Sequence, residues 1–362
     1  MKLKKKVAII GLGYVGLPLF LLVNKKYDVL GFDLSLDKVN LIKKNLSYIS
    51  DISNSELKKV NKKNIFSMSQ ISNITKCDYI ILCLPTPLKK NYPDMTYINS
   101  AFIKIFKFLK KNQTLILESS VFPGATKEIF EKKLNKKFNI GKNFFVGYSP
   151  ERIDPGKDKY SQKLEYKKIT KLVSGFTKEC NRKVSSLYKN IFEKIYVCKS
   201  IEIAETAKIF ENVFRSVNIA LVNEMKMITH KLKLNIHDVV DAAASKPFGF
   251  RKFVPGPGVG GHCIPVDPVF MTWLAKKKGQ ETKFINLSTI VNNNVTNWII
   301  RNIMQNVPKN KNLKCLIMGI AYKKNINDYR ESPSLKIFDK LRNKKRFIVD
   351  VCDPYIDEFT IK

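Results

Sequence analysis

The segment Val7-Ala8-Ile9-Ile10-Gly11-Leu12-Gly13-Tyr14-Val15-Gly16 decides the fold class of this chain. Four apolar residues predict a buried strand, and a Gly-x-Gly-x-x-Gly pattern follows it directly. Residues 29–33 predict a second strand that ends in an acid, Asp33. Strand, glycine turn and downstream acid together predict a dinucleotide-binding βαβ unit, although a glycine turn without a ligand is the alternative. An acid that accepts hydrogen bonds from ribose hydroxyls repels a 2′-phosphate, so we expect NAD rather than NADP.

Further strands are expected at residues 79–84, 115–118 and 144–147, each followed by a loop rich in Ser, Pro or Gly. This alternation with amphipathic stretches predicts an α/β fold, a Rossmann-type doubly wound sheet over residues 1–200. Helical periodicity takes over from residue 201, with a long helix over 202–230, and we expect a central helical domain at 201–305.

Residues 306–362 predict one more βαβ unit, with strands at 313–319 and 347–352 and a helix near Pro333. One such unit cannot cover both faces of its own strands. We therefore expect a partial second Rossmann-like domain that is truncated at its end.

The formal net charge of +34 invites a nucleic-acid partner. However, only eight of the 65 basic residues are arginines, and the lysines are scattered through every segment. Specific readers of phosphates and bases favour clustered arginines. We therefore expect no nucleic acid as a partner, and a charge that reflects composition.

The seven cysteines form no Cys-x-x-Cys pair, and no secretory leader precedes them. This pattern favours a reduced, cytoplasmic protein. Apolar runs such as residues 19–23 are too short to span a membrane. The three histidines show no ligand spacing, so we expect no metal site.

The loop Gly258-Val259-Gly260-Gly261-His262-Cys263-Ile264-Pro265-Val266-Asp267-Pro268 holds one thiol among glycines and prolines. Such a backbone lets a ligand approach closely, and an apolar core position has no need of it. We expect Cys263 to be a nucleophile, with the Asp267 carboxylate four residues later able to orient a base or a water. His262 has no paired acid in view and is expected to be structural or to face the cofactor. A buried, inert thiol is the alternative reading, and it is the expected one for Cys77, Cys83, Cys198 and Cys315.

On the long helix, Glu205, Lys208, Asn212 and Arg215 fall on one face. Their neighbours are apolar, so much of this helix is expected to be buried. Either this face is solvated, or Lys208 and Asn212 point into a site and stabilise a developing oxyanion.

These motifs occur in an order that resembles a known family. They are the Gly11–Gly16 turn, Leu84-Pro85-Thr86-Pro87, Ser149-Pro150-Glu151-Arg152, Lys208 with Asn212, the cysteine loop, Ala321-Tyr322-Lys323-Lys324 and Arg330-Glu331-Ser332-Pro333. Together they resemble the UDP-glucose/GDP-mannose dehydrogenase family, the nucleotide-sugar 6-dehydrogenases, from residue 7 to the end. The Ser-Pro-Glu-Arg segment and Phe248-Gly249-Phe250 are most similar to the UDP-N-acetylhexosamine branch.

The resemblance implies an NAD-dependent four-electron oxidation of the primary alcohol of a UDP-sugar, for surface polysaccharide precursors. Cys263 would capture an aldehyde as a thiohemiacetal and then carry a thioester, which water cleaves to the uronate. Lys208 and Asn212 would stabilise oxyanions, and Asp267 or Glu151 would assist hydrolysis. The central helices would form a homodimer or a higher homo-oligomer, and residues 306–362 would begin the nucleotide-sugar-binding domain.

The resemblance also implies site residues that the pattern alone does not give. The catalytic set is Cys263, Lys208, Asn212, Asp267, Glu151 and Ser120. The cofactor set is Gly11, Gly13, Tyr14, Val15, Gly16, Asp33, Lys38, Thr86, Pro87, Ser120 and Arg330. The substrate set is Glu151, Arg152, Lys208, Asn212, Arg215, Arg251, Phe253, Gly261 and Lys323.

The chain departs from the family's pattern in two residues. Pro155 replaces a second acid usual in the UDP-glucose branch, which leaves the hydrolytic base open between Asp267 and Glu151. Ser120 replaces a threonine but keeps the hydroxyl.

Several readings of the function stay open. The sugar is UDP-N-acetylglucosamine or UDP-N-acetylgalactosamine, with UDP-glucose and UDP-N-acetylmannosamine as alternatives. A two-electron 3-hydroxyacid dehydrogenase would not need Cys263. A truncated, inactive NAD-binding remnant is the rival from another class.

Overall fold

The computed structural model describes residues 5–152, 166–261, 264–309 and 312–356. The chain divides into two compact units, Met1–Ile209 and Phe210–Lys362. The helix α7 (Ile201–Lys231) is continuous across this boundary, so each unit contains part of it.

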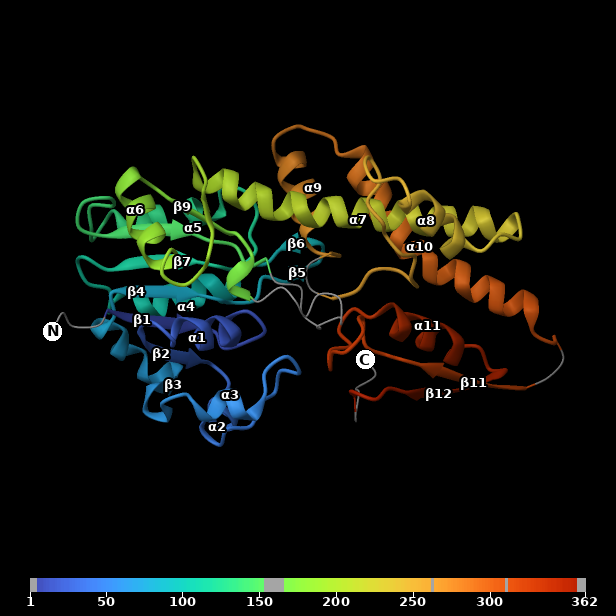
Figure 1. Ribbon diagram of the computed structural model, residues 1–362, viewed down its shortest axis with the longest axis horizontal. Coiled ribbons are helices and arrows are strands. Elements are labelled where there is room, and N and C mark those ends of the chain that lie inside the picture. Colours follow the sequence, from blue (N-terminus) through green and yellow to red (C-terminus); the bar gives the residue numbers. More distant parts are fainter. Residues whose placement is uncertain (1–4, 153–165, 262–263, 310–311, 357–362) are drawn as a thin grey trace. The chain divides into compact units, whose positions relative to one another are not determined.

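In its described residues, the first unit contains an eight-stranded sheet of order β10-β9-β8-β7-β4-β1-β2-β3 (Figure 1). The strands are β1 (Lys6–Ile10), β2 (Asp28–Asp33), β3 (Ile65–Ser67), β4 (Tyr79–Leu82), β7 (Thr114–Leu117), β8 (Phe145–Tyr148), β9 (Lys171–Gly175) and β10 (Ile195–Val197). All neighbours pair in parallel except β8 and β9, where Gly147 lies opposite Gly175 in an antiparallel register. A short hairpin, β5 (Leu88–Lys89) and β6 (Tyr92–Pro93), stands apart from this sheet.

Helices connect these strands, with α6 beside β9 at one end of the sheet and α2 next to β2 and β3 at the other (Figure 1). They are α1 (Gly16–Val23), α2 (Leu36–Lys43), α3 (Asn54–Lys58), α4 (Thr96–Phe106), α5 (Ala125–Leu134) and α6 (Lys178–Tyr188), with 3-10 turns η1 (Lys62–Asn64), η2 (Met68–Lys76) and η3 (Tyr166–Lys168). Side-chain caps fix several starts: Ser35 caps α2, Thr177 caps α6, and Ser53 with Glu56 forms a capping box on α3.

The central strands are buried along their whole length, as β4, β7 and β8 show. Continuous apolar strands without alternation are typical of a parallel sheet covered by helices on both faces. The core of this unit includes Val7, Ile9, Phe20, Val29 and Ile81. The doubly wound sheet predicted from the sequence is thereby confirmed.

The second unit continues α7 and adds α8 (Ile236–Ala244), α9 (Asp267–Lys277) and α10 (Lys283–Asn306). It ends in a parallel pair of strands, β11 (Leu313–Met318) and β12 (Phe347–Cys352), joined by α11 (Pro333–Arg342). One face of this pair packs on α10 and α11 around Ile300, Leu341 and Phe347. The other face leaves Leu316 and Met318 exposed among the described residues. The expected helical region and the final βαβ unit are both present.

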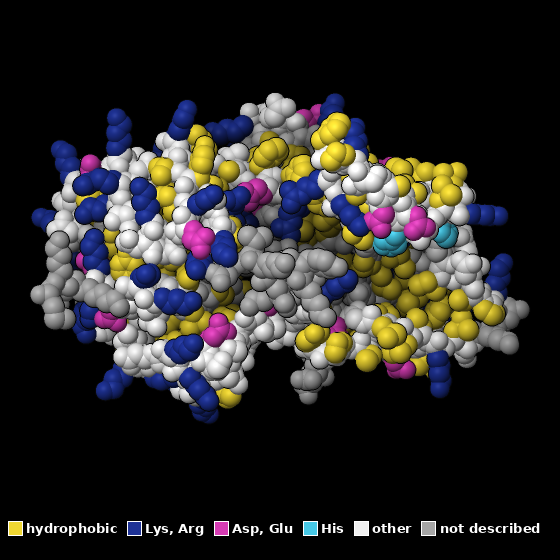
Figure 2. Space-filling model, viewed as in Figure 1, with side chains coloured by type: hydrophobic (Ala, Val, Ile, Leu, Met, Phe, Trp, Pro, Cys, Tyr) yellow, Lys and Arg dark blue, Asp and Glu magenta, His cyan; other side chains and the backbone are white. Residues whose placement is uncertain are grey.

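Figure 2 shows lysine and arginine side chains dispersed over the visible face rather than gathered in one patch. This dispersal agrees with the scatter of lysines along the sequence. Among the described helices, none joins the length and the apolar character that crossing a membrane requires.

Candidate active site

The glycine turn is shaped by contacts that only glycine allows. Gly11 has φ +94°, and a Cβ there would lie 2.3 Å from the carbonyl oxygen of Cys83. A Cβ on Gly16, the first residue of α1, would lie 1.7 Å from the carbonyl oxygen of Gly11. A Cβ on Gly13 would meet no atom within 4 Å, so this side of the turn is open. The open turn at a helix start is the geometry that accepts a pyrophosphate, with Tyr14 and Val15 between the glycines.

Asp33 fastens this turn to the end of β2. Its carboxylate oxygens accept hydrogen bonds from the backbone amides of Leu12 and Ser35, each at 2.8 Å. Tyr48 donates its hydroxyl to the Leu12 carbonyl, and the Lys38 ammonium lies 5.8 Å from the Tyr48 ring centre. Asp33 and Lys38, both predicted from the sequence, therefore belong to one network around the glycine turn.

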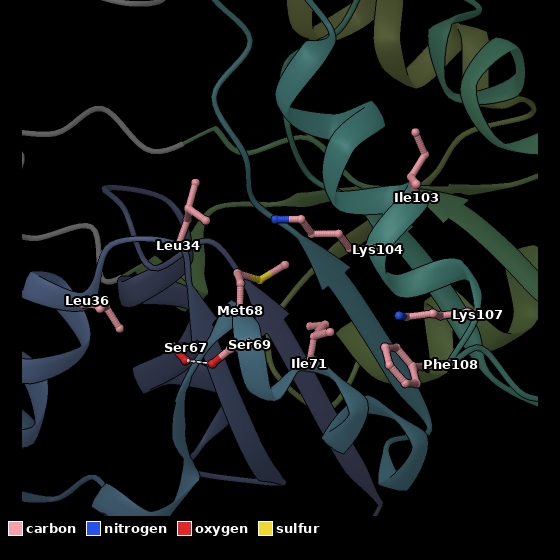
Figure 3. A pocket seen from close by; sticks show the side chains of 10 residues that line it. All are labelled: Leu34, Leu36, Ser67, Met68, Ser69, Ile71, Ile103, Lys104, Lys107 and Phe108. Atoms are coloured by element: carbon pink, nitrogen blue, oxygen red, sulfur yellow. Dashed lines mark hydrogen bonds between the residues drawn. The ribbon is translucent and has the colours of Figure 1, made fainter.

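A hollow of about 740 Å³ opens past the carboxyl ends of β2 and β3 (Figure 3). Leu34, Met68 and Ile71 give it apolar walls, and Lys104 of α4 and Lys107 just after that helix also line it. The Ser67 and Ser69 hydroxyls are hydrogen bonded to each other at 2.6 Å beside it. In sheets of this topology, ligands bind at this edge.

Two other predicted cofactor residues meet at the ends of β4 and β7. The Thr86 hydroxyl donates to the Ser120 carbonyl at 2.6 Å, and the Leu84 amide donates to the Ser119 hydroxyl at 2.9 Å. The neighbouring Pro87 carbonyl accepts the Asp94 amide at 2.9 Å. The structure thus joins the Leu84–Pro87 segment to the Ser119–Ser120 loop.

Glu151 follows β8 and is almost completely buried. One carboxylate oxygen accepts the Arg152 amide at 2.6 Å, and the other lies 3.4 Å from the Lys171 ammonium. The Arg152 guanidinium donates to the Thr170 carbonyl at 2.7 Å. Sequence reasoning missed Lys171 and its second partner, Glu118, because an isolated lysine or glutamate in a lysine-rich chain gives no pattern.

The polar face of α7 is buried at its start. The Glu205 carboxylate accepts hydrogen bonds from the Gly124 amide at 2.6 Å and from the Thr126 amide and hydroxyl at 3.0 and 2.6 Å. It thereby caps α5, and burial raises the pKa of Glu205 to about 7. Lys208, one turn later, is 7% exposed, so this part of the face is not solvated.

In the second unit, Asn212 and Asp267 form a buried pair. The Asn212 amide donates to an Asp267 carboxylate oxygen at 2.5 Å, and both side chains are about 1% exposed. Asp267 is the first residue of α9, where the helix dipole favours a negative charge. Arg215, on the same face of α7, is half-buried.

Buried amides hold the start of the glycine-rich loop. The Gly256 amide donates to Asn223 at 3.0 Å, and the Asn223 amide group donates to Asn292 at 3.2 Å. Asn292 in turn donates to the Ser216 carbonyl at 2.9 Å. Sequence reasoning missed Asn223 and Asn292, because asparagines on helices more often face solvent.

The end of the described loop lies against the chain after β11. Gly261 has φ +80°, and a Cβ there would lie 2.7 Å from the Tyr322 ring. Its amide donates to the Arg330 carbonyl at 3.3 Å. Arg330 itself makes a two-pronged ion pair with Asp328, and Lys323 nearby is half-buried. The predicted Arg330 and Gly261 are thus in direct contact.

His262 and Cys263 lie outside the described residues. Of the other predicted substrate residues, Arg251 is exposed and Phe253 packs edge-on against Phe214 at 5.9 Å beside a small apolar cluster. Within the described residues, no group of three or more His, Cys, Asp or Glu side chains could hold a metal ion.

Models of one family match nearly the whole chain. The NAD-binding domain of the UDP-glucose/GDP-mannose dehydrogenase family matches residues 5–192, its central domain 202–294 and its UDP-binding domain 316–362. The chain belongs to the UDP-glucose/GDP-mannose dehydrogenase family. It is therefore an NAD-dependent nucleotide-sugar dehydrogenase, as the motifs predicted.

Relatives in this dehydrogenase family share about a third of the sequence. The chain is 36% identical over 363 residues to UDP-N-acetyl-D-glucosamine 6-dehydrogenase of Pseudomonas aeruginosa, covering 97% of this chain and 83% of the relative. It is 34% identical over 348 residues to Protein CapL of Staphylococcus aureus, covering 94% and 80%.

Solved structures share its fold. The UDP-D-ManNAc dehydrogenase of Pyrococcus horikoshii superposes with a TM-score of 0.87 at 26% identity, over 97% of this chain and 84% of that one. The UDP-N-acetyl-mannosamine dehydrogenase Cap5O of Staphylococcus aureus superposes with a TM-score of 0.82 at 28% identity, over 99% and 84%.

Proposed function

We propose that this dehydrogenase oxidises the primary alcohol of UDP-N-acetylglucosamine or UDP-N-acetylgalactosamine to a carboxylate, for surface polysaccharide precursors. The buried Asn212–Asp267 pair is the observation that carries the proposal, because Asp267 stands four residues after Cys263. A buried amide fixed at 2.5 Å from a carboxylate is a preorganised polar group of the kind that oxyanion chemistry needs. The named N-acetylhexosamine dehydrogenases among the relatives support the sugar class.

The proposed chemistry has two oxidations and one hydrolysis. The alcohol loses two electrons to give an aldehyde, and the Cys263 thiol adds to its carbonyl carbon. Loss of two further electrons leaves a thioester, and water then cleaves the carbon–sulfur bond to release the carboxylate and the thiol. NAD supplies the hydride acceptor for each oxidation. Lys208 and Asn212 stabilise the oxygen that carries negative charge, and Asp267 or Glu151 takes the proton of the attacking water.

The residues of the first unit fit NAD. The open side of Gly13 and the start of α1 suit the pyrophosphate, and the Asp33 carboxylate at the end of β2 suits the adenosine ribose. The hollow between Leu34, Met68 and Lys104 has the apolar walls that suit the adenine ring. Thr86, Pro87 and Ser120 of this unit, and Arg330 of the second unit, are also proposed contacts of the cofactor.

The residues of the predicted substrate set are proposed to bind the sugar nucleotide. Arg152 and Arg215 join Glu151, Lys208 and Asn212 in this set, and it is completed by Arg251, Phe253, Gly261 and Lys323. Guanidinium and ammonium groups suit the anionic diphosphate.

The stoichiometry of NADH tests the proposal. Incubated with NAD and each UDP-sugar in turn, the enzyme should form two NADH for each sugar acid. We expect turnover with a UDP-N-acetylhexosamine to exceed turnover with UDP-glucose. One NADH for each aldehyde released would contradict the covalent route, and a preference for UDP-glucose would contradict the sugar class. A preference for UDP-N-acetylmannosamine would change only the epimer.

A further inference from the structure

A buried cluster of charges lies behind Glu151. The Lys171 ammonium is 2.7 Å from a carboxylate oxygen of Glu118 and 3.4 Å from one of Glu151. The Tyr188 hydroxyl donates to the other oxygen of Glu118. Lys171, Glu118 and Glu151 are 2%, 1% and 8% exposed, so water screens these charges little.

The sheet topology brings these groups together. Glu118 and Glu151 follow the carboxyl ends of β7 and β8. Because β9 runs antiparallel to β8, its first residue, Lys171, lies at the same edge. A parallel β9 would have placed its carboxyl end there instead. The antiparallel direction of β9 thus places the Lys171 ammonium at the edge of the sheet where the ligand-binding loops lie.

The cluster contains two carboxylates and one ammonium. Without the Lys171 cation, keeping both buried carboxylates ionised would be energetically unfavourable. Burial lowers the pKa of Lys171, but Glu118 and Glu151 raise it, and the net direction is upward. Burial raises the pKa of Glu118 against the opposing effect of Lys171.

The other groups packed against Lys171 leave its charge in place. The Tyr188 and Phe192 ring centres lie 5.5 and 5.4 Å from the ammonium, where aromatic faces attract a cation. The Cys83 thiol lies close enough to interact electrostatically with Lys171, Glu118 and Glu151. Burial raises the pKa of Cys83, so the thiol stays neutral. Lys171 is therefore a fixed positive charge within the cluster.

We infer that Lys171 is a positioning residue for the reaction: it holds the Glu151 carboxylate ionised and in one orientation. This inference rests on the proposed function, in which Glu151 assists thioester hydrolysis. The geometry fixes both oxygens of Glu151, one by Lys171 and the other by the Arg152 amide at 2.6 Å. Glu118 and Tyr188 hold the ammonium from behind. A carboxylate held in this way can accept a proton from water at neutral pH.

Substitutions that change the cluster charge in opposite directions test the inference. Lys171→Met removes the cation, so the ionisation midpoint of Glu151 should rise by about one pH unit or more. Glu118→Gln removes the competing carboxylate with almost no change in shape, so the midpoint should fall. Lys171→Arg keeps the charge and should restore a midpoint near that of the wild type. Opposite shifts distinguish this role from a merely structural one.

Two measurements should agree. Infrared titration of protein labelled with ¹³C-glutamate follows carboxylate ionisation directly, and subtraction of a Glu151→Gln sample identifies the Glu151 band. The acidic limb of the kcat–pH profile with NAD and UDP-N-acetylglucosamine should move in the same directions. Lys167→Met is the control, because its exposed pair with Glu193, at 3.5 Å, lies outside the cluster. Neither its infrared midpoint nor its profile should move.

Unchanged midpoints in Lys171→Met and Glu118→Gln would overturn the inference. So would infrared shifts without a matching shift of the kcat profile, because Glu151 would then have no part in turnover. If Lys171→Met does not fold, the downward shift of the Glu151 midpoint expected in Glu118→Gln still tests the inference. A wild-type enzyme that forms no uronate would overturn the proposed function instead, and the infrared titration would still decide whether Lys171 holds Glu151 ionised.

Discussion

Thiols in this chain differ in the environment that the fold gives them. Cys77, Cys83 and Cys198 are buried, and burial raises the pKa of all three, that of Cys77 to about 12. A thiol with a raised pKa is a poor nucleophile, because the thiolate is the reactive form. The predicted burial of these three thiols is confirmed, whereas Cys315 is only half-buried.

Replacement of the loop thiol should therefore separate chemistry from binding. In Cys263→Ser we expect NADH formation to fall by at least about a hundredfold, because a serine hydroxyl is a much weaker nucleophile at neutral pH. NAD binding, measured by fluorescence titration, should persist. Cys198→Ser is the matched control and should change stability only. Near-normal turnover of Cys263→Ser would make that cysteine structural.

At this scale the sequence predicted residues that belong to a recognisable pattern. The glycine turn, Asp33, Lys208, Asn212 and Asp267 stood in motifs, and the structure gives each a consistent environment. Lys171, Glu118 and Asn223 were missed, because their roles arise only when distant strands and helices meet. Their spacing along the chain forms no pattern that would indicate these contacts.

The junction of α5 with α7 depends on one buried carboxylate. Glu205 has its pKa raised to about 7, above the ordinary 4.5, so the folded protein binds a proton there more tightly than the unfolded chain. Its contribution to stability is full below pH 4.5 and is lost as the pH rises to about 7. From that shift, the loss is on the order of 3 kcal/mol.

Glu205→Gln should remove this pH dependence. We expect the free energy of unfolding of the wild type, measured by urea titration, to be lower at pH 8 than at pH 5. In Glu205→Gln the difference between the two pH values should be smaller. Glu202→Gln is the control, because the Lys127 ammonium lies 2.7 Å away and the net pKa of Glu202 is lowered. The Lys127–Glu202 ion pair stabilises the folded protein above pH 4.5, so Glu202→Gln should lower the free energy of unfolding at pH 8. Equal pH slopes in the wild type and Glu205→Gln would contradict the assignment.

Elements marked by an apolar run or by helical periodicity were predicted well, and strands without such a pattern were not. The strands β1, β2, β4, β7, β8, β11 and β12 and the helix α7 agree with the sequence patterns to within a few residues. No sequence pattern indicated β3, β10 or the reversed β9. The formation and the direction of those strands depend on tertiary pairing rather than on composition.

Self-association belongs to the whole molecule and remains a prediction. Within the described chain, α7 leaves Phe214, Leu221 and Ile228 exposed, and α10 leaves Phe284 and Leu287 exposed. Hydrophobic side chains gather over the helices of the second unit in Figure 2. Apolar patches of this kind mark interaction surfaces.

We expect the chain to sediment as a dimer at micromolar concentration. Leu221→Lys should shift it toward monomer, because a charge in an apolar interface is costly. Tyr196→Lys, on the exposed strand β10 of the first unit, is the control and should leave the sedimentation coefficient unchanged. A wild-type monomer at tens of micromolar would contradict the prediction.

The continuity of α7 has a consequence for building chimaeras between related dehydrogenases. A crossover at residue 209, where the compact units divide, would join two half-helices from different parents. The anchor of Glu205 on α5 and the Asn212–Asp267 pair would then come from different sequences, although Glu205 and Asn212 belong to one helix. Viable recombinants between family members should therefore inherit residues 201–231 as one block, with their junctions in the loops on either side.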